Sequence, residues 1–164
     1  MTKCTLFDSI SIQIISFVFY MEVIMDLLNA TDVRKNWSFT LDQVAHERPA
    51  YVKRTHDNVA IMSVSTLNAM LAGYRFYADK FNEDDGTVTL SAIDLDIVVN
   101  DVNEEAARHR MAEYIKEYAE EFYSEYALWS KAPNRQAHIP YVFKALTLDI
   151  DAIEGDIICR HGKN

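Results

Sequence analysis

The sequence is poor in the residues that mark metal sites, disulfides and flexible linkers. Its 164 residues include only two cysteines, four glycines and three prolines. The spacing of Cys4 and Cys159 fits neither a paired zinc-ligand motif nor a small disulfide scaffold, so we expect a reducing, cytoplasmic setting. Because glycine and proline are scarce and no repeat or low-complexity run occurs, the chain is predicted to be folded almost throughout.

A hydrophobic run long enough to cross a bilayer is also missing. The stretch at 9–20 is interrupted by polar residues and is shorter than the ~20 apolar residues that a spanning helix needs. No small-residue cleavage site follows it, so a secretory signal is not expected. We interpret residues 1–20 as an extension, either a start assigned upstream of Met21 or a β-rich arm that packs on a partner chain, and we expect no membrane partner.

Acidic residues outnumber basic ones, but unevenly along the chain. The net charge of −9 argues by itself against a nucleic-acid partner, because a polyanion repels an acidic surface. Residues 1–80 are nevertheless neutral, whereas residues 81–164 hold 8 of the 16 basic and 17 of the 25 acidic residues. This asymmetry predicts two units with different partners.

A short strand and a long helix are predicted after Met21. Residues 22–28 are strand-like, and Asn29 with Asp32 three residues later is typical of a helix start. Apolar residues then recur at helical spacing as far as Pro49, which ends the helix. The predicted buried face consists of Val33, Trp37, Leu41, Val44 and Ala45.

A hairpin and a second helix are predicted next. Strand-like runs at 50–55 and 59–64 flank His56-Asp57-Asn58, which are turn formers that tolerate positive φ. Ser65 is the expected cap of the second helix. The apolar residues of that helix fall three and four positions apart, at Leu67, Met70, Leu71, Tyr74 and Tyr77. The predicted order over residues 21–80 is therefore β-α-β-β-α.

Two motifs in this region resemble the Phd/YefM antitoxin family. Residues 29–38 read Asn-Ala-Thr-Asp-Val-Arg-Lys-Asn-Trp-Ser, and residues 52–64 read Val-Lys-Arg-Thr-His-Asp-Asn-Val-Ala-Ile-Met-Ser-Val. The family shows a Thr/Ser-x-x-Arg-x-Asn-hydrophobic-Ser helix, a strand ending in a basic pair and a turn, and a strand before a helix that begins with Ser. The resemblance covers about residues 21–77. It fails at the turn, where His56-Asp57-Asn58 replaces the family's frequent Arg-Gly.

The resemblance implies a type II antitoxin that neutralises a cognate toxin and, as a homodimer or higher homo-oligomer, binds operator DNA to repress its own operon. The family's DNA-contacting positions fall on Arg34, Asn36 and Ser38, with Lys35 beside them, and on Lys53 and Arg54. These residue types suit the role. Arginine binds guanine or phosphate, asparagine pairs with adenine, and serine or lysine holds phosphate.

The second half of the chain predicts a small acidic β-β-α-β-β domain, so that the fold class is α+β. The polar segment 82–86 is the expected boundary, and the domain is expected to span 86–164. Strands are predicted at 87–91, 93–99, 140–148 and 156–160, with a long helix at 104–129. The segment around Asn100-Asp101-Val102-Asn103 resembles the HicB-like antitoxin domain, although the Pro-Gly element of that family is missing.

The long helix is predicted to have one apolar and one acidic face. The apolar stripe consists of Ala107, Met111, Tyr114, Ile115, Tyr118, Phe122 and Tyr126. An RNA-cleaving toxin is expected to be basic, and an acidic surface attracts a basic one. We therefore expect the toxin to contact the carboxylates of Glu113, Glu117, Glu120 and Glu121.

No convincing active site is present, so we expect neither an enzyme nor a cofactor or metal. Asp94 and Asp96 alternate on a predicted strand, and with His138 they leave a metal-dependent hydrolase open as an alternative. Cys159 and His161 are scattered zinc candidates without close pairing. A second alternative is a stand-alone transcriptional regulator whose C-terminal domain senses a small molecule.

Overall fold

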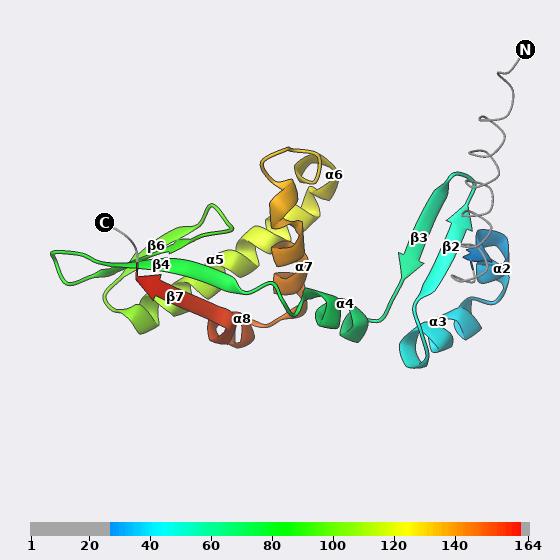
Figure 1. The fold of residues 1–164 in the computed structure, drawn as a ribbon, viewed down its shortest axis with the longest axis horizontal. Coiled ribbons are helices and arrows are strands. Elements are labelled where there is room, and N and C mark those ends of the chain that lie inside the picture. The colour runs from blue at the N-terminus through cyan, green and yellow to red at the C-terminus, as the bar shows by residue number, and fades with distance from the viewer. Residues whose placement is uncertain (1–26, 162–164) are drawn as a thin grey trace, which may run out of the picture. The chain divides into compact units, whose positions relative to one another are not determined.

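A computed structural model describes residues 27–161, so the expected extension at 1–20 and most of the strand expected at 22–28 lie outside the described residues. The described part is an α+β structure with two sheets and seven α-helices, which confirms the predicted class (Figure 1). The chain divides into unit 1, Met1–Leu67, and unit 2, Asn68–Asn164. None of the helices in the described segment is long and apolar enough to cross a membrane.

The division between the units lies inside helix α4 (Val64–Leu71), earlier than the expected boundary at 82–86. Two features explain the difference. The helix expected to continue to Tyr77 stops at Leu71, ahead of Gly73, and strand β4 (Phe76–Asn82) follows it. The polar segment after β4 is the tight turn of a hairpin in which Glu83 and Thr87 are hydrogen bonded.

Unit 1 contains a three-stranded sheet with two helices packed against its central strand. Strand β1 (Leu27–Asn29) runs parallel to β2 (Ala50–Arg54), and β2 pairs antiparallel with β3 (Asp57–Ile61). Helices α2 (Ala30–Lys35) and α3 (Trp37–His46) connect β1 to β2 and contact β2. The Asn29 side chain accepts a hydrogen bond from the Thr31 amide, which confirms Asn29 as the cap of the first helix.

The single helix expected from residue 30 to Pro49 is in fact two helices that meet at Asn36. Asn36 has φ −116° and ψ 34°, outside the helical region, and both its backbone and side-chain nitrogens donate to the carbonyl oxygen of Asp32. Asparagine interrupts a helix in this way because its amide competes for backbone groups. The break changes the buried face: Val33, Thr40 and Val44 are buried, whereas Trp37 is 49% exposed, contrary to prediction.

The hairpin of unit 1 turns one to two residues earlier than expected. Arg54 pairs with Asp57, so Thr55 and His56 form the loop, and Asp57 and Asn58 belong to β3. Thr55 has φ 56°, the one positive φ outside glycine in the described chain. A β-branched residue is strained there because its Cβ crowds the backbone.

Thr55→Gly is therefore expected to raise the free energy of unfolding by about 1 kcal/mol, since relief of the left-handed strain exceeds the added entropy of the unfolded chain. The neighbouring loop substitution His56→Gly is the control. It relieves no positive φ and is expected to destabilise the protein by a few tenths of a kcal/mol. Urea unfolding of both variants measures the difference, and a Thr55→Gly variant less stable than the parent would contradict the strain.

Unit 2 contains a four-stranded sheet with the order β6-β5-β4-β7. Strands β4, β5 (Val88–Ala92) and β6 (Val98–Asp101) form an antiparallel meander, and β7 (Ile157–His161) returns parallel to β4. Asp94 and Asp96, expected on a strand, lie instead in the loop between β5 and β6, where the Ala92 amide bonds to the Ile97 carbonyl.

Helices α5 (Glu104–Ser124), α6 (Tyr126–Trp129), α7 (Ile139–Thr147) and α8 (Ile150–Asp156) separate β6 from β7, with a short 3-10 turn at Gln136–His138. The strand expected at 140–148 is thus the helix α7. Pro140 occupies its first turn, where proline is tolerated, and Val142 and Ala145 are buried at a spacing of three, which fits a helix rather than a strand.

The core of unit 2 forms where α5 packs on β5, β6, α7 and α8 (Figure 1). The Asn103 side chain caps α5 by accepting from the Ala106 amide. Most of the predicted apolar stripe is buried, but Tyr114 is 44% exposed, and Ala112 and Ala119 complete the buried face in its place. The small alanine side chains allow α5 to approach its neighbours closely. The sequence prediction missed these two residues because it followed the larger apolar and aromatic side chains.

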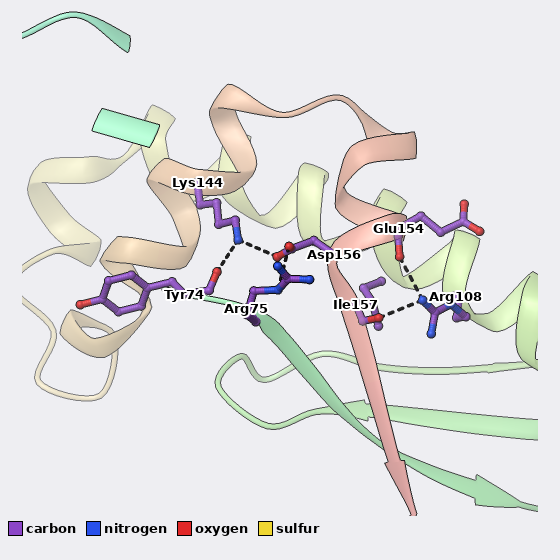
Figure 2. A network of polar contacts seen from close by, with 7 residues as sticks. All are labelled: Tyr74, Arg75, Arg108, Lys144, Glu154, Asp156 and Ile157. Atoms are coloured by element: carbon purple, nitrogen blue, oxygen red, sulfur yellow. Dashed lines mark hydrogen bonds and ion pairs between the residues drawn. The ribbon is translucent and has the colours of Figure 1, made fainter. Parts of the chain in front are cut away.

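A polar network fixes the segment that leads into β4. Lys144 of α7 is buried, and its Nζ donates to the carbonyl oxygen of Tyr74 and to Asp156 Oδ2 (Figure 2). Arg75 Nε lies 2.9 Å from Asp156 Oδ1. In the same region the Arg108 guanidinium donates to the carbonyls of Glu154 and Ile157. These contacts join α5, α7, α8 and the start of β4.

Candidate functional site

The predicted DNA-binding residues of the first motif cluster around the break between α2 and α3. Arg34 and Lys35 form the last turn of α2, and Ser38 lies in the first turn of α3; all three are exposed. Asn36 gives α3 no side-chain cap, and its side-chain nitrogen donates to the carbonyl oxygen of Asp32. The first turn of α3 therefore has no side-chain cap and follows two cations in the chain, an arrangement that attracts phosphate.

The predicted basic pair at the end of β2 does not present both charges to one side. Consecutive residues of a strand point to opposite faces, and Ala50 and Val52 are buried under the helices. Arg54 therefore shares the side of the sheet that carries α2 and α3, whereas Lys53 shares the opposite side with Tyr51. Lys53 also has an interaction partner of its own. Arg54 therefore lies on the same face of the sheet as α2 and α3, which carry the other predicted DNA-binding residues, and Lys53 lies on the opposite face.

Unit 1 exposes an unusual amount of apolar surface for so small a unit. Phe39 is 68% exposed and Val59 is 49% exposed, and every residue of β3 except Ile61 is exposed. Leu41, predicted to be buried, is 41% exposed. Sequence periodicity missed this surface because it treated α2 and α3 as one helix. Large apolar side chains exposed in such numbers are typical of a unit that another chain covers.

Three of the four carboxylates predicted to contact a toxin line a groove in unit 2. The groove has a volume of about 750 Å³ and runs between α5 and the loop joining α7 to α8. Glu113, Glu117 and Glu120 lie along its α5 side, at spacings of four and three that place them on one helix face. Glu121, the fourth predicted residue, is exposed but does not line the groove.

The far side of the groove combines apolar and acidic side chains. Leu146, Leu148 and Ile150 are partly buried against the core, and Asp149 and Asp151 add two carboxylates. The Asp149 side chain accepts a hydrogen bond from the Ala152 amide and so caps α8. The sequence did not predict this wall of the groove, because residues 140–148 were expected to form a strand and not a helix followed by a loop.

The one lysine that lines the groove is occupied at the end of α7. Lys116 Nζ donates to the carbonyl oxygens of Ala145, Leu146 and Leu148, at 3.1, 3.4 and 2.9 Å. Carbonyls at a helix C-terminus lack intrahelical donors and attract a cation. Since Lys116 is held there, it neutralises the carboxylates of the groove only in part.

Comparison with known proteins supports a particular family. A family model described as the antitoxin of RelE/RelB-type toxin–antitoxin systems, PHD-like, matches residues 24–158. The chain belongs to this antitoxin family. A crystal structure described as the antitoxin part of a proposed toxin/antitoxin system from Syntrophomonas wolfei subsp. wolfei is similar, with 31% identity and a TM-score of 0.80. The similarity covers 83% of this chain and 99% of the other. No curated protein matches the sequence.

Both units belong to the pattern that the antitoxin family shares. The family match begins in the N-terminal part of unit 1 and ends at residue 158, in β7 of unit 2. Unit 2 is therefore part of the family's own architecture.

A separate group of titratable residues in the antitoxin surrounds His138. The His138 Nδ1 lies 2.6 Å from the Tyr118 hydroxyl, and Arg135 donates to Asp96 at 2.7 Å. Burial, followed by the charge of Arg135, lowers the pKa of His138 below its ordinary 6.5, and burial raises the pKa of Tyr118. A buried neutral imidazole held by a phenol suits a structural role better than proton transfer near neutral pH.

Asp94 and Asp96 lie close enough to His138 to act on its charge, but the residues considered as metal ligands form no metal site in the described chain. Within residues 27–161 no group of three or more His, Cys, Asp or Glu side chains is placed to hold a metal ion. The Cys159 Sγ accepts a hydrogen bond from Arg108, and burial raises the pKa of the Cys159 thiol. A protonated thiol is a poor metal ligand and a poor nucleophile.

Proposed function

We propose that this antitoxin represses its own operon by binding operator DNA as a homodimer through unit 1, and that it neutralises a cognate toxin through unit 2. The observation that carries the DNA-binding part is the arrangement at the α2–α3 break. Arg34 and Lys35 lie beside the uncapped amino terminus of α3. Cations and free backbone amides together bind a phosphate backbone even in a chain of negative net charge.

The contact set proposed for DNA is Arg34, Lys35, Asn36 and Ser38, with Arg54 on the same side of the sheet as the helices. One of the two amide hydrogens of Asn36 is bonded to Asp32, which leaves the second hydrogen and the carbonyl oxygen for an adenine edge. Lys53 faces the other side of the sheet and is proposed as a lesser contributor.

A second copy of the chain is the proposed cover for the apolar surface of unit 1. Trp37, Phe39 and Val59 are each at least 49% exposed, and burying them across a two-fold axis removes apolar area from water. The dimer also doubles the number of phosphate contacts. A neutral half-chain needs this doubling to bind DNA at physiological salt.

Arg34→Ala is expected to weaken operator binding about tenfold or more without altering the oligomeric state, because one bidentate arginine contact contributes ~1–3 kcal/mol. Lys131→Ala is the matched control: it removes one exposed cation from unit 2 and is expected to leave DNA affinity unchanged. A gel-shift titration with the promoter fragment upstream of the gene measures both.

Repeating it between 50 and 200 mM salt is expected to give a steep loss of affinity for the parent and a shallower one for Arg34→Ala. Equal binding by parent and Arg34→Ala would contradict the proposed surface.

For unit 2 we propose binding rather than catalysis. The support is the groove lined by Glu113, Glu117 and Glu120, which presents carboxylates to a partner. An RNA-cleaving toxin carries basic surfaces for its own substrate, so an acidic partner surface attracts it and competes with RNA. A cytoplasmic setting is part of this proposal, because operator DNA and RNA are both found there.

A further inference from the structure

We propose that the groove between α5 and the α7–α8 loop receives a basic amphipathic segment of the toxin, with its Lys or Arg side chains on Glu113, Glu117 and Glu120 and its apolar side chains on Leu146, Leu148 and Ile150. This inference rests on the proposed neutralising function. It assigns toxin recognition to a preformed site in a folded unit rather than to a segment that folds on binding.

The spacing of the carboxylates fits a row of cations better than a single ion. Residues four and three apart on a helix lie about 5–6 Å from one another, so Glu113, Glu117 and Glu120 form a line along α5. In the described chain, no three acidic or metal-binding side chains converge on one point. A line of carboxylates matches cations placed one turn apart on a facing helix, or at alternate positions of a strand.

The charges available to a partner follow from the contacts within the groove. The Glu113 Oε1 atom lies 3.7 Å from Nε2 of His109. Glu117 and Glu120 form no ion pair with any residue of the described chain. Lys116 is held by three backbone carbonyls of α7 and its following loop. Of the three carboxylates on the α5 side of the groove, Glu117 and Glu120 are therefore the two whose charges a bound cation would neutralise most effectively.

The opposite wall explains why the occupant is amphipathic rather than simply basic. Leu146, Leu148 and Ile150 are half-buried hydrophobic residues whose exposed parts face the groove beside the carboxylates. Apolar side chains of a partner seated there exclude water from the neighbouring ion pairs and so strengthen them. Such a site discriminates an amphipathic segment from a polycation that binds by charge alone.

The test uses the full chain co-expressed with the protein encoded by the adjacent open reading frame. The double variant Glu117→Lys/Glu120→Lys reverses the two carboxylates on the α5 side of the groove that have no ion pair. Its matched control, Glu83→Lys/Asp84→Lys, makes the same change of charge in the exposed turn between β4 and β5 of the same unit, outside the groove. We expect affinity for the neighbouring protein to fall at least 100-fold for the first variant and less than about fivefold for the control. A cooperative urea-unfolding transition followed by tryptophan fluorescence, to which Trp129 of unit 2 contributes, serves as the measure of folding, and both variants are expected to keep it.

The outcomes separate the two proposals. If the parent chain captures the neighbouring protein and the groove variant captures it equally well, the groove is wrong and the neutralising function stands. If both variants lose affinity to the same extent, attraction depends on overall charge, and the groove is again wrong. If the parent chain captures nothing, the neutralising function itself fails, together with the inference that depends on it.

Discussion

Replacing Phe122 by alanine is expected to lower the free energy of unfolding by about 4 kcal/mol, the largest stability effect that we predict. Phe122 is fully buried on the inner face of α5. Its ring lies 6.0 Å from those of Tyr118 and Tyr126 and 5.7 Å from that of Trp129. Truncation removes the transfer energy of the ring and leaves a cavity that these rigid neighbours fill only in part.

The control for this variant is the next residue in the chain. Tyr123 is 57% exposed, so Tyr123→Ala is expected to cost less than about 1 kcal/mol. Urea unfolding followed by Trp129 fluorescence compares the two directly. If both substitutions had similar costs, the orientation of α5 would be wrong, and with it the position of the acidic residues along the groove.

The second large effect is expected for Asp156→Asn, which should destabilise the protein by about 3 kcal/mol. The carboxylate contacts Lys144 Nζ at 2.6 Å and Arg75 Nε at 2.9 Å, and the Lys144 side chain is only 11% exposed. Neutralising Asp156 leaves a buried ammonium with the Tyr74 carbonyl but without a counter-ion. Removing one partner of a buried pair costs far more than the pair contributes in net stability.

Asp101→Asn provides a matched control. Both carboxylates have side chains that are 14% exposed, but the partner of Asp101 is Arg110, whose side chain is 49% exposed and remains solvated when the pair is broken. We expect a loss below about 1 kcal/mol. The double replacement Lys144→Met/Asp156→Leu is expected to be more stable than Asp156→Asn, because no buried charge is left unpaired. Thermal unfolding that ranked the double variant lowest would contradict this interpretation of the network.

The sequence predicted well where local pattern is enough. The cap at Asn29 follows from residue type and position, and it is present. The stripe that includes Met111, Ile115 and Phe122 follows from helical spacing over a long segment, and it is buried. The motifs at 29–38 and 52–64 indicated an antitoxin, and the family match over residues 24–158 confirms that identification.

Prediction failed where the outcome depends on contacts distant in sequence. The apolar run at 140–148 suits a buried strand or a buried helix equally, and its helical state as α7 is fixed by packing against α5. The second helix was expected to continue to Tyr77, yet Phe76 begins strand β4, which β5 on one side and β7 on the other supply with hydrogen-bond partners. Neither partner is visible from the local sequence.

By itself, the sequence determined the antitoxin family, the α+β class and the contrast between the neutral residues 1–80 and the acidic residues 81–164, because composition and short motifs carry that information. The tertiary structure decided where the charges act. The break at Asn36 creates a second helix amino terminus beside Arg34, and the packing of α7 and α8 on α5 turns a row of glutamates into one wall of a groove. Both features depend on backbone geometry and on contacts between residues far apart in the chain, and spacing along one segment does not encode them.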